Sequence, residues 1–162
     1  MKFDTQKINL WFAQLDSRFE QVPGIIGETA TEFYKANFAQ AQWEGVPWPA
    51  RKDNKTHPLL RKTGNLFSSI SYSVPNPNKV LVSAGRNKRT PYARVHNEGQ
   101  RVRGVQNVRP YTHPNLFGKG RRQVSSFTRQ VNFKMPQRQF IGPSAILNIQ
   151  IMNRLKMAFN SK

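Results

Sequence analysis

The chain contains no cysteine and only 8 acidic residues among 162. Without cysteine there are no disulfides, no thiolate chemistry and no cysteine-ligated zinc. No apolar run approaches the roughly 20 residues that a membrane-spanning helix needs. The N-terminal stretch 1–12 also lacks the pattern of a signal peptide. We therefore expect no partnership with a membrane.

The few acids are unevenly placed. Lys and Arg number 26, which gives a formal net charge of +18. Residues 1–54 hold six basic and seven acidic residues, whereas residues 55–162 hold 20 basic residues and a single acid, Glu98. A small soluble domain usually carries a net charge of about 2–8. Such an excess repels itself, so we expect acidic neighbours near residues 55–162.

Motifs for catalysis are missing as well. His57, His96 and His113 do not have the spacing of metal ligands, and the chain has no nucleophile elbow, phosphate-binding loop or dinucleotide fingerprint. We predict no catalytic residue, no cofactor and no metal site, and expect that the protein is not an enzyme. A nuclease that uses His96 and Glu98 remains as a remote alternative.

The length favours one domain with an α+β fold. We expect two N-terminal helices within residues 1–42, the second beginning near Pro23. Apolar residues follow the first helix at helical spacing and are expected to lie in the core. They are Ile8, Trp11, Phe12, Leu15 and Phe19.

The rest of the chain divides into four segments. Residues 43–58 read as an irregular loop, and residues 59–98 as a small antiparallel sheet that the helices cover. Its first two strands form a hairpin around 70–84, whereas 92–96 suits a strand or a helical turn. Residues 99–134 have no acid and read as a protruding basic loop or hairpin arm. Residues 135–162 end in a helix capped by Ser144.

Three short segments resemble the phage virion morphogenesis family of tail-completion proteins. They are Leu59–Ile70, Pro91–Gly99 and Met135–Ser144, in that order along the chain. The residues that carry the resemblance are Thr63, Gly64, Leu66, Ile70, Tyr92, Ala93, His96, Gly99, Pro136, Arg138, Phe140, Gly142 and Ser144. Asn97-Glu98 departs from the Gln-aromatic pair that often follows this histidine in the family. Most of these residue types serve packing and turns, so we expect fold determinants rather than a binding site.

The resemblance implies a structural protein of the virion, assembled in the host cytoplasm and placed in the tail or neck. Its partners would be copies of itself in a ring of about six, the tail tube or terminator, and the head connector. Packaged DNA is a further non-specific contact. The residues predicted at oligomer or neck interfaces are Trp48, Arg51, Arg101, Arg103, Arg109, Arg121, Arg122 and Arg129. A basic nucleic-acid-binding protein without catalytic activity is the alternative function.

Overall fold

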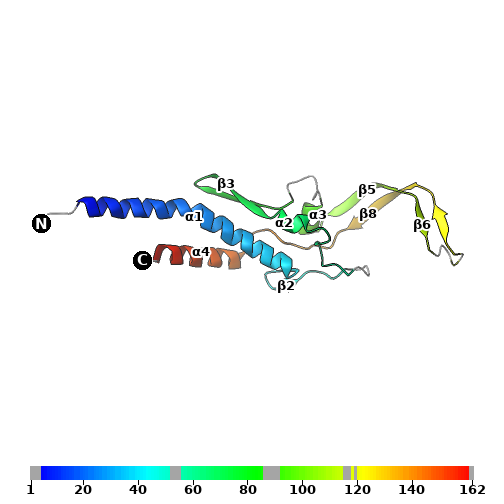
Figure 1. Ribbon diagram of the computed structural model, residues 1–162. Helices are drawn as coiled ribbons and strands as arrows, with labels where there is room; N and C mark the ends of the chain where they lie inside the picture. Colours follow the sequence, from blue (N-terminus) through cyan, green and yellow to red (C-terminus); the bar gives the residue numbers. More distant parts are fainter. Residues whose placement is uncertain (1–4, 52–55, 86–91, 115–117, 119, 161–162) are drawn as a thin grey trace.

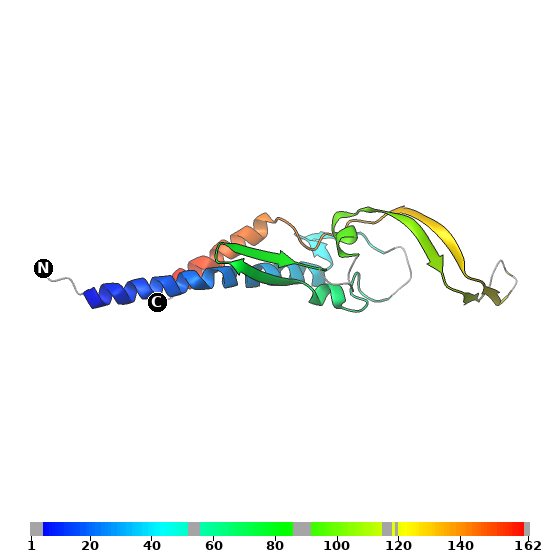
Figure 2. The ribbon, with the colours of Figure 1, turned by 90° about the horizontal axis from the view of Figure 1, so that it is seen from above.

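The computed structural model describes residues 5–51, 56–85, 92–114, 118 and 120–160. The molecule is long and narrow (Figure 1). Helices α1 and α4 form one end, and a long two-stranded hairpin reaches away from them to the other end (Figures 1 and 2). The fold is α+β, as the sequence predicts.

Helix α1 spans Thr5–Ala39 and contains Pro23 in its interior. The prediction of two separate N-terminal helices is therefore wrong. Proline removes one backbone hydrogen bond from a helix and disfavours its continuation. Helix α4 contacts α1 on both sides of Pro23, because Arg18 donates to the Phe159 carbonyl and Arg154 pairs with Glu32. This bracing offsets the missing hydrogen bond.

The first half of α1 is exposed, which corrects a second expectation. Ile8, Trp11, Phe12 and Phe19 keep 42–58% of their surface accessible, and Leu15 is half-buried. The buried residues of α1 begin only at Gly27. Near the last residues of α4, Phe159 packs on Phe19 with ring centroids 5.4 Å apart. Among the described elements, none therefore covers the turns of α1 that precede Phe19.

Helix α4 spans Ala145–Asn160 and runs antiparallel to α1. Its N-terminus is capped as predicted, since the Leu147 amide donates to Ser144 Oγ at 3.0 Å. The Ser144 hydroxyl also donates to the Glu44 carboxylate at 2.5 Å, which ties this cap to the segment after α1.

Strands β3 (Ser71–Asn76) and β4 (Lys79–Ser83) form the predicted hairpin. The Asn78 amide donates to Asn76 Oδ1 at 3.1 Å and so tightens the turn. The hairpin packs on α1 at Gly27, where a Cβ atom would lie 2.2 Å from the Tyr72 ring. Only a glycine allows this approach.

The predicted single sheet does not form among the described residues. They contain four separate two-stranded ladders instead. Two of these are β3–β4 and the short pair β1 (Gln42–Trp43) with β2 (Val46–Pro47). The other two belong to the long hairpin, which extends away from the helices and so brings no strand to the edge of β3–β4 (Figure 2).

Two short helices lie within the segment predicted as a sheet. Helix α2 (Asn65–Ser68) precedes the β3–β4 hairpin. Helix α3 (Ala93–Glu98) settles the open choice at residues 92–96 in favour of a helical turn. No helix within the described ranges is both long and apolar enough to cross a membrane.

The core lies where the second half of α1 meets the middle of the chain. Phe38, Phe140, Leu66 and Ile70 are at most 1% exposed. Around them lie further buried side chains from four segments: Ala30, Phe33, Tyr34, Trp48, Ala93 and Leu147. Phe38 is the centre of an aromatic cluster, with its ring 5.4 Å from those of Trp48 and Phe140.

The long hairpin consists of two ladders in series. Strand β5 (Arg101–Val108) pairs with β8 (Phe127–Lys134), and β6 (Tyr111–His113) pairs with β7 (Arg122–Val124). Both pairs are antiparallel and in regular register. This segment is the one predicted as a loop or hairpin arm.

Candidate functional site

The family-like residues converge on the base of the long hairpin and divide into two groups. Leu66, Ile70, Ala93 and Phe140 are buried in the core and hold α2, α3 and the segment after β8 together. The others lie around them, at turns or on the rim of a groove. Pro91, which opens the second segment, lies outside the described residues.

Two glycines of these motifs have backbone angles that favour glycine. Gly64 precedes α2 with φ of 72°, a conformation that glycine adopts without strain. Gly99 ends α3 with φ of 65° and is buried. A Cβ atom on Gly99 would lie 2.8 Å from Cβ of Gln137. Gly99 therefore lets the segment after β8 lie directly against the end of α3.

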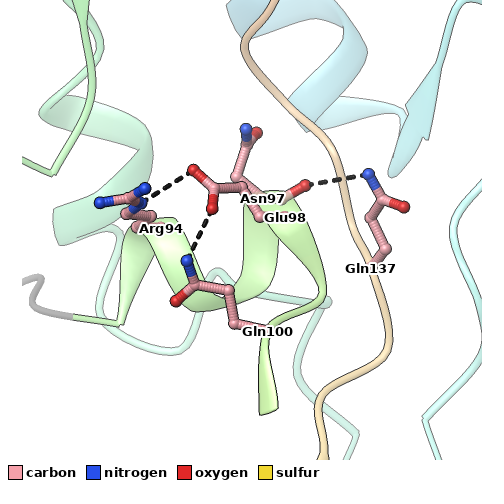
Figure 3. A network of polar contacts seen from close by, with 5 residues as sticks. All are labelled: Arg94, Asn97, Glu98, Gln100 and Gln137. Carbon is pink, nitrogen blue, oxygen red and sulfur yellow. Dashed lines mark hydrogen bonds and ion pairs between the residues drawn. The ribbon is translucent and has the colours of Figure 1, made fainter. Parts of the chain in front are cut away.

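Asn97 is a structural clamp that the sequence reasoning missed. Its side-chain oxygen accepts hydrogen bonds from the amides of Phe140 and Ile141, at 3.0 and 3.1 Å. Gln137 donates to the Asn97 carbonyl, and Glu98 accepts from Arg94 on the same short helix and from Gln100 just after it (Figure 3). Asparagine near the C-terminal end of a short helix is the available signal, because its side chain competes for backbone partners.

Arg138 is buried and fixes the irregular loop. Its guanidinium donates to the carbonyls of Pro49 and Ala50, at distances of 3.1–3.5 Å. The planar guanidinium carries several N–H donors, which suits donation to two neighbouring carbonyls.

Two predicted interface residues lie in this loop and bind their own chain. Trp48 is only 7% exposed and donates from Nε1 to the Gln139 carbonyl at 2.6 Å. Arg51 is half-buried and donates to the carbonyl of His57. The indole of Trp48 is thus covered by the core of its own subunit, and its part in an interface stays a prediction.

A basic groove of about 890 Å³ lies beside this loop. It is lined by the motif residues Thr63, Tyr92, His96, Pro136 and Arg138, together with Arg51, Lys62 and Lys134. No acidic side chain is among its described lining residues. The groove therefore has a positive potential that suits an anion more than a cation.

His96 lies on the wall of this groove. Burial lowers its pKa below the ordinary value of 6.5, and the nearby positive charge of Arg138 lowers it further. Among the described residues, no three histidine or carboxylate side chains gather as metal ligands. The Glu98 carboxylate accepts from Arg94 Nε at 2.9 Å, on the surface of α3. The geometry thus gives the nuclease alternative no support.

The β5–β8 ladder has two different faces. Directly paired residues of an antiparallel ladder share a face, and the faces alternate along each strand. One face is mainly apolar and includes Val102, Val108, Phe127, Val131 and Phe133, with Arg129 bonded to Gln106 among them. The other face is polar and includes Arg101, Arg103, Val105, Asn107, Thr128, Gln130, Asn132 and Lys134. We call these the apolar face and the polar face.

The predicted interface arginines fall in different places on this hairpin. Arg101 and Arg103 lie on the polar face, and Arg101 donates to Asn132 Oδ1. Arg129 lies on the apolar face. Beyond β5, Arg109, Arg121 and Arg122 are exposed near the far ladder. The hairpin brings these arginines together on one element, but not on one surface.

Comparison with known proteins gives one assignment. No curated protein and no solved structure matches the chain. The phage virion morphogenesis family matches residues 3–160, which is nearly the whole chain. The protein therefore belongs to the phage virion morphogenesis family.

Proposed function

We propose that the protein is a non-enzymatic component of the phage neck that completes the tail or joins head to tail as a ring of about six copies. Family membership supports a role in building the virion. The ring, the neck position and the partners are the finer part of the proposal. The proposed partners are the tail tube or terminator and the head connector.

The observation that carries the proposal is the distribution of exposed surface. The subunit is elongated and places its long hairpin at one end and the exposed half of α1 at the other (Figure 1). Soluble monomers rarely expose large contiguous apolar patches, whereas assembly surfaces do. Contacts between different surfaces of identical subunits close into rings when the rotation allows.

The test is a shortened hairpin in the phage genome. Arg103 and Asn132 are directly paired, so a two-residue Asn-Gly turn can join them in place of residues 104–131. The core residues lie outside this segment, so we expect a folded chain. Phage carrying it should accumulate separate heads and tails in electron micrographs. Normal yields of infectious particles would contradict the proposal.

The alternative is a nucleic-acid-binding protein. The basic groove and the exposed arginines support it. Binding through several phosphates falls steeply with salt. Tight DNA binding by the isolated protein with such a slope, together with an absence of assemblies, would favour the alternative. We prefer acidic protein neighbours for these cations, because no base-stacking motif accompanies them.

A further inference from the structure

The exposed apolar residues in the first half of α1 form a surface of defined shape. An α-helix turns by about 100° per residue, so Ile8, Trp11, Phe12, Leu15 and Phe19 fall within a band roughly 100° wide. Over the 11 residue steps from Ile8 to Phe19 this band is about 17 Å long. We call it the helix stripe. Leu10 lies on the opposite side of α1 and is 63% exposed.

The two borders of the helix stripe differ. Arg18 lies on one border and donates to the Phe159 carbonyl in the last turn of α4, and Phe19, inside the stripe at its C-terminal end, packs on the Phe159 ring. On the other border lie Asp16 and Glu20, both exposed. Neither carboxylate makes an ion pair with another described residue. The stripe is thus an apolar band with an acidic edge.

The apolar face of the hairpin matches this band in length and in charge. From Val102 to Val108 the strand advances roughly 20 Å, close to the length of the stripe. Phe127 and Phe133 are 42% and 46% exposed at its two ends. Arg129 lies between them on the same face. An apolar face with a cation is complementary to an apolar band with an acidic edge.

The two surfaces belong to opposite ends of the molecule and do not meet within one chain (Figures 1 and 2). We propose that they meet between copies: the apolar face of the β5–β8 ladder in one subunit packs on the helix stripe of the next. Arg129 then lies beside Asp16 and Glu20 of that neighbour. The contact is head-to-tail, so it repeats around an assembly. The inference rests on the proposed ring and says which surfaces build it.

The test uses the full chain and two variants with matched controls. Phe12→Asp places a charge in the helix stripe, and Leu10→Asp places the same charge on the opposite side of α1. Val131→Asp disrupts the apolar face, and Val105→Asp adds a charge to the polar face, where Val105 is 69% exposed. Circular dichroism shows which variants keep the wild-type fold, and light scattering after gel filtration gives their mass.

We expect wild type and both controls to assemble, and Phe12→Asp and Val131→Asp each to have the mass of one chain. An equal mixture of these two variants should form a complex of two chains and no more. In that complex the intact hairpin of one chain binds the intact stripe of the other, and both remaining surfaces are defective. Glu20→Arg combined with Arg129→Glu should assemble better than Arg129→Glu alone. If Val131→Asp loses its fold, Phe127→Asp takes its place in the mixture.

The contradicting results separate this inference from the proposed function. If both disrupting variants still form wild-type assemblies, other surfaces build the ring and only this inference fails. The same holds if either variant alone pairs into dimers, since that indicates a contact of identical surfaces. If wild type itself has the mass of one chain at its highest soluble concentration, the proposed ring fails and the inference with it.

Discussion

Replacement of Asn97 by alanine should destabilise the fold although Asn97 is not a core residue. The Asn97 side chain accepts from the amides of Phe140 and Ile141. Phe140 is 1% exposed and packs on Phe38 in the aromatic cluster. Alanine leaves both amides without this acceptor in a place that water reaches poorly.

The magnitude follows from the cost of unpaired amides. A buried donor that loses its partner costs about 1–3 kcal/mol. Phe140 is buried and Ile141 is half-buried, so we expect a loss of about 2–4 kcal/mol from the free energy of unfolding. Domains of this kind are stable by about 5–15 kcal/mol in total, so the change is large.

Urea unfolding followed by tryptophan fluorescence measures this loss, since Trp43 and Trp48 belong to or pack against the core. Gln137→Ala is the matched control, because the exposed Gln137 donates only to the Asn97 carbonyl, at 3.3 Å. It should cost less than about 0.5 kcal/mol. Asn97→Asp keeps the oxygen acceptors and should lose less than Asn97→Ala. Equal stability of Asn97→Ala and Gln137→Ala would refute the reasoning.

Two further predictions concern α1 and α3. Gly24→Ala should raise the free energy of unfolding by about 0.5–1 kcal/mol, because alanine favours a helix and nothing lies within 4 Å of the new Cβ. Gly27→Ala should lower it, since its Cβ would collide with the Tyr72 ring; urea midpoints that rise in both variants would contradict this packing. The pKa of His96 lies below 6.5 in the folded chain, so below about pH 6.5 the unfolded chain binds more protons than the folded chain. The free energy of unfolding therefore decreases as the pH is lowered. The slope between pH 7 and 5 should be flatter in His96→Gln, and an unchanged slope would show that His96 does not cause it.

Local patterns predicted much of the fold. The β3–β4 hairpin follows from alternation on either side of an Asn-Pro-Asn turn, and the start of α4 from Ser144 ahead of an apolar i+4 series. Each of these depends on interactions within a few residues, which the sequence shows directly.

The wrong expectations all depended on distant packing. The helix stripe reads as core by its spacing, but α4 covers α1 only as far as Phe19. Pro23 reads as a helix start, yet α4 braces α1 on both sides of it. Asn97 has no motif of its own, because its role depends on backbone amides more than 40 positions away. Spacing shows that a face is apolar, and only the tertiary structure shows what covers it.

The polar face of the hairpin gives the basic charge a separate task. If the apolar face packs on a neighbouring subunit, then Arg101, Arg103 and Lys134 point away from that contact, because they occupy the opposite face of the same ladder. Self-assembly and attraction of an acidic partner are then separable by mutation. Arg101→Glu with Arg103→Glu should leave the mass of the purified assembly unchanged and reduce the yield of joined phage particles. Loss of the assembly itself in this double variant would show that the polar face builds the ring, and that the two faces do not divide these tasks.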